Sequence, residues 1–206
     1  MSVFLLHNRV KLALHTLREG EGRALLHLHA LGERSPESVP TDLEAWPGPI
    51  FALDFTGHGA STVPGGGGDT AEVLMGDADA ALNRIGEATV GGRGLGADIA
   101  SPDPVRGAIL CDGAGLVGGG ERPGPIAVRG VPGKSTSPDP FALVELSSDL
   151  RPAEYVTRFV EIAVANSTLA EPISVAARAR PDWLAAVVAR KGVRVEGVEE
   201  ALGRFR

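Results

Sequence analysis

Short hydrophobic runs, separated by polar or glycine-rich segments, predict alternating strands and helices along most of the chain. Residues 10–17 alternate imperfectly between apolar and polar side chains, which predicts a half-buried strand. The continuous apolar run at residues 24–29 is typical of a buried strand in a parallel sheet. Further strands are predicted at residues 50–54, 88–90, 106–111, 173–176 and 193–195.

Helical patterns lie between these runs. Residues 70–85 carry apolar side chains at three- and four-residue spacing, which predicts an amphipathic helix. Asp139-Pro140 is typical of a helix start, with proline at the first helical position. Other helices are predicted at residues 152–166, 181–190 and 198–205. Because strands alternate with helices, we expect an α/β fold with a mostly parallel, doubly wound sheet.

Composition narrows the class of protein. The chain has 206 residues, enough for one domain with a sizeable core. A net charge of -6 and the lack of a basic, aromatic-rich cluster argue against nucleic acid as a partner. No apolar run approaches the roughly 18 residues of a membrane helix, and the first residues do not resemble a signal peptide. With Cys111 as its single cysteine, the protein is expected in the reducing cytoplasm, away from membranes.

Three segments carry a family resemblance. Residues 25–32 are similar to a strand that ends in H-G-x-G, and residues 52–61 match D-x-x-G-H-G-x-S. Gly92-x-Gly94-x-Gly96 has the spacing of the nucleophile elbow G-x-S-x-G. Together and in this order, they resemble the α/β-hydrolase superfamily. The resemblance implies a core of residues 1–112 and 171–206, with residues 113–170 as a Gly/Pro-rich loop and lid-like helices.

The same resemblance implies where a catalytic site would lie. Its nucleophile position is Gly94, which has no side chain. Backbone N–H groups of Ala30 or Leu31, and of Leu95, would form an oxyanion hole at the carboxyl ends of the strands. The acid position falls at Asp182 or at Asp112.

The histidine position of this family is also empty. It belongs in the loop after the last strand, where Val195 leads directly into the final helix, and all 5 histidines lie within the first 58 residues. The chain is therefore expected to be a divergent member without the catalytic serine and histidine. Since Ser101-Pro102-Asp103-Pro104 interrupts the helix after the elbow, that helix should have at most about two turns.

Several residues allow a structural or a catalytic interpretation. His29 and His58 either support their loops by hydrogen bonding or transfer protons. Asp112 either lines a pocket or holds a loop, and Asp182 also fits a first-turn acid of a helix. Cys111, inside an apolar strand, is expected to be an inert core residue.

The glycine runs do not match a nucleotide-binding loop, and no cluster has metal-ligand spacing, so we expect neither cofactor nor metal. The leading hypothesis is a protein without serine-hydrolase activity that binds a small molecule with a carbonyl or carboxylate group, or a protein partner. The alternative is an active hydrolase- or lyase-like enzyme that uses the oxyanion hole with non-covalent acid/base chemistry from His29, His58 or Asp112. Homo- and hetero-oligomers both remain open.

Overall fold

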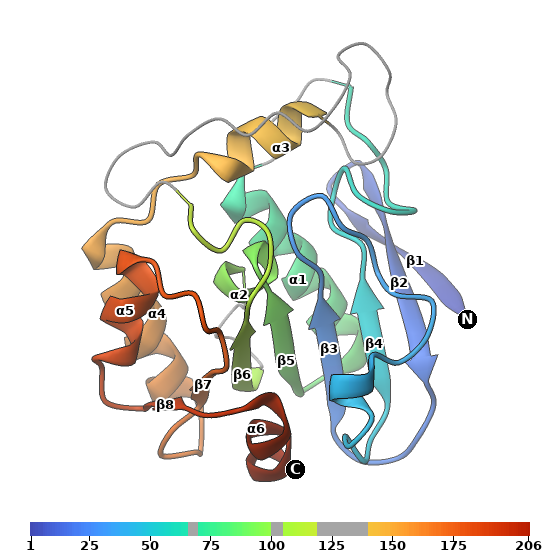
Figure 1. Cartoon of the computed structure of the whole chain (residues 1–206). Helices are drawn as coiled ribbons and strands as arrows, with labels where there is room; N and C mark the ends of the chain where they lie inside the picture. The colour runs from blue at the N-terminus through green and yellow to red at the C-terminus, as the bar shows by residue number, and fades with distance from the viewer. Residues whose placement is uncertain (66–69, 100–104, 119–139) are drawn as a thin grey trace.

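The computed structural model describes residues 1–65, 70–99, 105–118 and 140–206 of the chain (Figure 1). Most of the glycine run at residues 65–68, all of residues 101–104, and most of the predicted 113–140 loop lie outside the described residues.

An 8-stranded sheet in the order β1-β2-β4-β3-β5-β6-β7-β8 forms the centre of the molecule. β1 and β2 run antiparallel to their neighbours, whereas all pairs from β4 to β8 are parallel. The predicted α/β, mostly parallel sheet is therefore confirmed. The strands are β1 (Ser2–His7), β2 (Val10–Arg18), β3 (Ala24–Leu28), β4 (Ile50–Leu53), β5 (Ala88–Arg93), β6 (Val105–Cys111), β7 (Ile173–Val175) and β8 (Val193–Val195).

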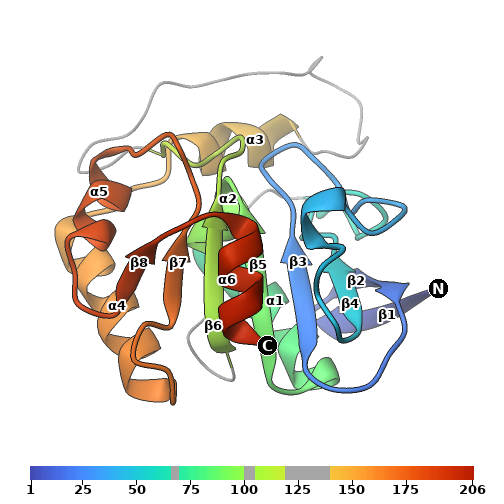
Figure 2. The same ribbon diagram turned by 60° about the horizontal axis from the view of Figure 1, so that its bottom comes forward.

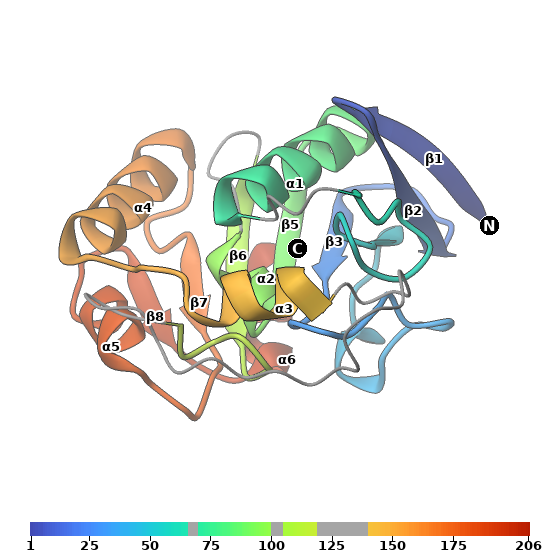
Figure 3. The ribbon, with the colours of Figure 1, turned by 90° about the horizontal axis from the view of Figure 1, so that it is seen from above.

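Helices cover both faces of this sheet (Figures 2 and 3). The face with α1 and α4 holds the larger apolar cluster, and the face with α6 and the short helix η1 holds a smaller one around Trp46 and Phe205. α3 lies beyond the carboxyl ends of the central strands. The helices are η1 (Thr41–Leu43), α1 (Ala71–Ile85), α2 (Leu95–Asp98), α3 (Pro140–Ser147), α4 (Ala153–Asn166), α5 (Asp182–Val188) and α6 (Val198–Phe205).

Two strands differ from the sequence prediction. β1 was not predicted, because its residues are apolar on both faces: Phe4 and Leu6 point to solvent, and Leu5 packs against the core. β5 continues to Arg93, beyond its predicted end at residue 90. Glycine has low strand propensity, but Gly91 and Gly92 pair with both β3 and β6. Pairing with the neighbouring strands, rather than intrinsic propensity, therefore makes these two residues part of β5.

The predicted division at residues 113 and 170 stays a prediction. Val156, Phe159 and Val160 of α4 belong to the larger apolar cluster, as does Leu146 of α3. Both helices therefore contribute to the main core, whichever boundary is drawn.

Candidate functional site

The turn between β5 and α2 has the backbone geometry of a sharp strand-to-helix elbow. Gly94 has φ 55° and ψ -115°, a conformation that side-chain-bearing residues rarely adopt. It precedes α2, whose 4 residues agree with the shortened helix predicted from the sequence. The turn lies at the carboxyl end of a central strand, where parallel α/β folds bind ligands.

All three glycines of the elbow motif are in close contact with backbone. A Cβ atom on Gly92 would lie 2.3 Å from the Gly96 carbonyl oxygen, and one on Gly96 would lie 2.7 Å from the Leu28 carbonyl oxygen. At Gly94 the obstacle comes from a distant segment, because a Cβ atom would lie 2.1 Å from the carbonyl oxygen of Ala114. Main-chain atoms therefore occupy the space that the Cβ atom of a residue at position 94 would need.

The Ala114 carbonyl oxygen accepts two hydrogen bonds from the elbow region. The N–H groups of Leu31 and Leu95 both donate to it, each at 3.0 Å. These distances are those that oxyanion-hole donors make with a charged oxygen. Of the two residues considered after β3, Leu31 converges with Leu95, whereas the Ala30 N–H points to the Glu33 carboxylate at 3.4 Å.

Buried side chains hold the segment that carries Ala114. Arg151 donates to the carbonyl oxygens of Leu116 at 2.7 Å and Gly115 at 2.9 Å. The Trp183 indole N–H also donates to the Leu116 carbonyl at 2.6 Å, and the Arg151 guanidinium stacks over the Trp183 ring at 5.0 Å. Buried side chains therefore hold the two residues that follow Ala114.

The two candidate histidines are each committed to the backbone through both ring nitrogens. His29 Nδ1 donates to the Ala30 carbonyl at 2.8 Å, and its Nε2 accepts from the Phe55 N–H at 3.2 Å. His58 Nδ1 donates to the Thr56 carbonyl at 3.0 Å, and its Nε2 accepts from the Gly32 N–H at 3.3 Å. Burial, helped by the His58 ring, lowers the pKa of His29 to about 3, so its ring is neutral.

The candidate acids lie in different environments. The Asp112 carboxylate accepts from the N–H groups of Arg178 at 2.9 Å and Ala179 at 3.0 Å, so it holds the loop after β7. Asp182 is exposed in the first turn of α5. Burial raises the pKa of the Cys111 thiol to about 12, so the reactive thiolate is not populated near neutral pH.

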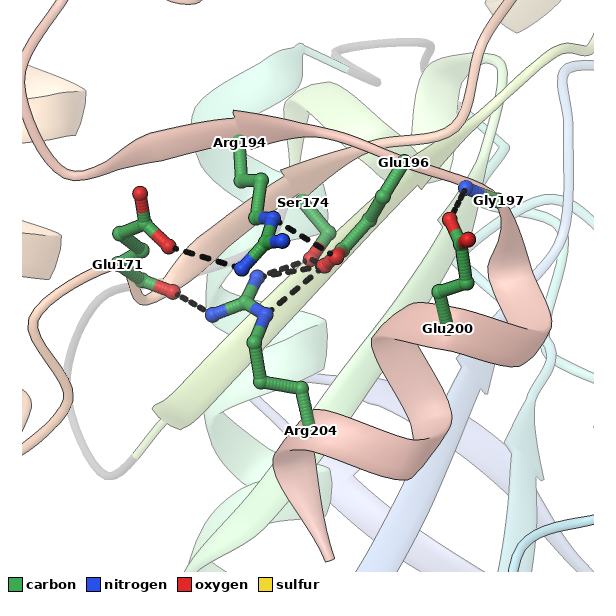
Figure 4. Close-up of polar contacts among 7 residues, drawn as sticks. All are labelled: Glu171, Ser174, Arg194, Glu196, Gly197, Glu200 and Arg204. Carbon is green, nitrogen blue, oxygen red and sulfur yellow. Dashed lines mark hydrogen bonds and ion pairs between the residues drawn. The ribbon is translucent and has the colours of Figure 1, made fainter.

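The loop after β8, where the resemblance places a histidine, holds an ion-pair cluster (Figure 4). Glu196 Oε1 accepts from the Arg204 guanidinium at 2.7 Å and from the Ser174 hydroxyl at 2.5 Å. The Arg194 Nε lies 3.3 Å from Glu196 Oε2. These groups join β7, β8 and α6, and burial would raise the pKa of Glu196, but its hydrogen bonds with Arg204 and Ser174 bring the value below normal.

Sequence reasoning missed a buried carboxylate on α1. Asp77 is fully buried and accepts from the Thr56 N–H at 2.7 Å, from the Thr56 hydroxyl at 3.0 Å and from His7 Nδ1 at 2.7 Å. Its position three residues after Leu74, on the apolar face of the helix, was the available signal. Within the described ranges, no group of three His, Cys, Asp or Glu residues could hold a metal ion.

No helix among the described residues is both long and apolar enough to cross a membrane. No protein-family model matches the chain, and no curated protein matches its sequence. Solved structures do match its fold. The crystal structure of the N-formylmaleamic acid deformylase Nfo from Pseudomonas putida S16 has a TM-score of 0.67 and 16% sequence identity, over 97% of this chain and 93% of that one.

Two further similar structures match about half of the chain. They are the epoxide hydrolase VrEH1 from Vigna radiata (TM-score 0.47, 20% identity, 54% of this chain and 37% of that one) and the esterase RhEst1 from Rhodococcus sp. ECU1013 (0.46, 23%, 53% and 45%). The chain therefore spans less than half of these two enzymes. With the deformylase matched over almost its whole length and with the observed sheet, the chain is a protein of the α/β-hydrolase fold.

Proposed function

We propose that the elbow of this α/β-hydrolase-fold protein is a non-hydrolytic site that binds a small molecule through the backbone N–H groups of Leu31 and Leu95. The observation that carries the proposal is the convergence of both N–H groups on one oxygen, at 3.0 Å each. A carbonyl or carboxylate oxygen of a ligand would take the place of the Ala114 carbonyl. Because both donors are backbone N–H groups, this binding site needs no nucleophilic side chain at position 94.

Three features support the absence of acyl transfer at this site. Gly94 offers no nucleophile, and main chain fills the position of a Cβ atom there. The loop after β8 carries Glu196, paired with Arg204, in place of a histidine base. Acyl transfer in this fold needs nucleophile and base together, and loss of either one removes most of the rate.

The alternative, acid/base chemistry by His29, His58 or Asp112, has less support. Both histidines use each ring nitrogen to hold backbone, and a proton transfer would break one of those bonds. The Asp112 carboxylate is likewise engaged by two N–H groups. A protein partner in place of a small molecule remains the second form of the binding hypothesis.

Amide NMR tests the binding site directly. The name of the deformylase Nfo suggests a first probe, maleate, a small dicarboxylate. We expect maleate, titrated against equal concentrations of chloride salt, to shift the ¹H–¹⁵N signals of Leu31 and Leu95 as Ala114 is displaced. No shift of either signal at 50 mM maleate would contradict the proposal.

A variant that loosens the 113–118 segment sharpens this test. Arg151→Met removes the two charged hydrogen bonds that hold Gly115 and Leu116, each worth about 1.5–3 kcal/mol. The ligand then displaces Ala114 more easily, and we expect maleate to bind at least about tenfold more tightly. Arg158→Met, on the exposed face of α4, is the matched control and should leave the affinity unchanged. Competitive inhibition of ester hydrolysis by maleate, with a Ki that Arg151→Met lowers as it lowers the Kd, would place hydrolysis at the elbow and contradict the non-hydrolytic part of the proposal.

A further inference from the structure

A serine, a histidine and an aspartate form a hydrogen-bonded line across three neighbouring strands. Ser2 of β1 lies directly opposite His15 of β2 in the antiparallel register, and Asp54 follows β4, the next strand in the sheet. The Ser2 hydroxyl lies 2.8 Å from His15 Nδ1, and His15 Nε2 lies 2.9 Å from Asp54 Oδ2. Nucleophile–base–acid sets are recognised by such geometry, whatever their order along the chain.

The backbone holds the aspartate of this line in place. Asp54 is 2% exposed, and its carboxylate accepts from the N–H groups of Ser35 at 2.7 Å and Ala60 at 2.8 Å. Burial would raise the pKa of Asp54, but these bonds and the one from His15 bring the value below normal, so the group is a carboxylate. A carboxylate only accepts, so His15 Nε2 carries the proton. In the tautomer with its proton on Nε2, Nδ1 accepts a hydrogen bond from the Ser2 hydroxyl.

The line borders a cavity of about 410 Å³, which is large enough for a small molecule. Ser2, His15 and Asp54 are all among its lining residues, together with Arg34 and Glu37. The Arg34 side chain is 73% exposed, and only a 3.7 Å contact links it to Glu37, so its guanidinium is accessible to a ligand. The Ser2–His15–Asp54 line and an accessible guanidinium therefore border one cavity that can hold a small substrate.

We propose that Ser2, His15 and Asp54 form a second site, which hydrolyses small esters that carry a carboxylate. Its nucleophile would be Ser2, its general base His15, and Asp54 would orient the imidazole. Arg34 would bind the substrate carboxylate. β4 and β3 separate β2 from β5 in the sheet, roughly 15 Å in all, so this site is distinct from the Gly94 elbow and does not rest on the ligand proposed there.

The reaction balances with water as the only co-reactant. Ser2 Oγ attacks the ester carbonyl while its proton passes to His15 Nδ1. The tetrahedral intermediate then expels the alcohol, which takes that proton and leaves an acyl-Ser2 ester. A water molecule, deprotonated by His15 Nδ1, attacks the acyl group, and the proton returns to Ser2 Oγ as the carboxylic acid leaves.

The chain offers a matched control for the histidine. His7 pairs with Asp77 at 2.7 Å, and its side chain is 22% exposed, as is that of His15. The Nε2 atom of His7 meets the Asn8 amide at 3.1 Å, with no hydroxyl in the pair, and His7 does not line the cavity. His7→Gln therefore removes a similar His–Asp pair without touching the proposed site.

The experiment uses mono-p-nitrophenyl succinate, a small ester with a carboxylate, and the full chain with Met1 retained, as verified by intact mass. Initial rates of p-nitrophenol release would be measured for the wild type and for five variants. The variants are Ser2→Ala, His15→Gln, Arg34→Gln, His7→Gln and Ser38→Ala, the last of an exposed serine outside the cavity lining. A fluorophosphonate label with peptide mapping would locate the nucleophile.

We expect Ser2→Ala to abolish catalysed release and labelling, and His15→Gln to slow acylation by about 10²-fold or more. Arg34→Gln should raise KM for the succinate ester but not for neutral p-nitrophenyl acetate. The His7 and Ser38 variants should match the wild type. Release that is equal in wild type and Ser2→Ala, or a label on another residue, would overturn this second site. Neither result bears on the Leu31 and Leu95 amides, whose test is the maleate titration.

Discussion

At Gly94, two independent features disfavour a side chain. The backbone has φ 55°, and a Cβ atom would lie 2.1 Å from the Ala114 carbonyl oxygen. The first feature belongs to the elbow itself and would apply equally to a serine. The second arises only because residues after β6 approach the elbow. The observed path of the 113–118 segment therefore requires glycine at position 94. The residue does more than leave out a nucleophilic hydroxyl.

Substitution of this glycine should be costly. We expect Gly94→Ala to lower the free energy of unfolding by about 2–6 kcal/mol, because it adds backbone strain and forces the Ala114 carbonyl away. Urea denaturation would measure the loss. Gly203→Ala is the control, since a Cβ atom there meets nothing within 4 Å and alanine favours the α6 helix. A Gly94→Ala variant as stable as the wild type would contradict this prediction, because it would mean that the 113–118 segment moves away at no cost in free energy.

Two buried aspartates should give opposite pH effects. The pKa of Asp54 lies below its ordinary value of 3.8 in the folded protein, so its carboxylate stabilises the fold above that pH and the contribution is lost as pH falls. Mainly through burial, the pKa of Asp77 is raised above 3.8, so its contribution is complete in acid and is lost as pH rises through the raised value.

Urea denaturation between about pH 7 and pH 2 would separate these two carboxylates. We expect Asp54→Asn to cost about 1–3 kcal/mol at neutral pH and to flatten the decline of stability toward acid. Asp77→Asn should make that decline steeper, because it removes a group that binds its proton more tightly in the folded state. The same slope in both variants would contradict these assignments.

At the scale of elements, local pattern accounts for most of the fold. The period of Leu74, Ala78 and Leu82 and the apolar runs of β3, β4 and β6 placed those elements correctly. β1 was missed because an edge strand with apolar residues on both faces lacks the alternation that marks a strand. β5 was predicted too short because its last residues are strand-forming only between two neighbours.

The candidate site follows the same division between local and distant effects. Gly94 and Leu95 follow from a five-residue motif, and the Leu31 N–H from its place after β3. Nothing local indicates that Ala114 turns its carbonyl toward them, since that depends on Arg151 and Trp183, far along the chain. The Ser2–His15 contact likewise needs the register of β1 against β2.

The cluster around Glu196 should make α6 depend on one arginine. Arg204 donates to both Glu196 and Ser174, and the Glu196 side chain is only 6% exposed. We expect Arg204→Met to lower the free energy of unfolding by about 2–3 kcal/mol at neutral pH, measured in urea. The loss should shrink in acid, where Glu196 is protonated. Arg34→Met, from a pair exposed to 73% and 93%, should cost about 0.5 kcal/mol or less.

For the molecule as a whole, β1 forms one edge of the sheet among the described residues. Its paired neighbour there is β2, and it carries Phe4 at 62% and Leu6 at 73% exposure, without a charged residue or proline in Ser2–His7. Natural sheet edges commonly use charges or proline to prevent pairing with another chain. We therefore expect β1 to be the strand through which two copies of this chain associate.

Substitution on β1 tests that role. We expect the wild type to show a molar mass that rises with concentration in light scattering, and Leu6→Lys to keep it near that of one chain. Val164→Lys, at a valine that is 40% exposed on α4, is the control for added charge and should behave as the wild type does. If the Leu6 and Val164 variants associate equally, another surface is responsible.

The Ala114 carbonyl also bears on whether serine-hydrolase chemistry could be built at the elbow. A Cβ atom at position 94 would lie 2.1 Å from this oxygen, which already accepts from the Leu31 and Leu95 N–H groups. A serine at position 94 would therefore need a different path for the 113–118 segment. A designer would have to change that segment first and the glycine second, because neither the space nor the two donors are available in the observed arrangement.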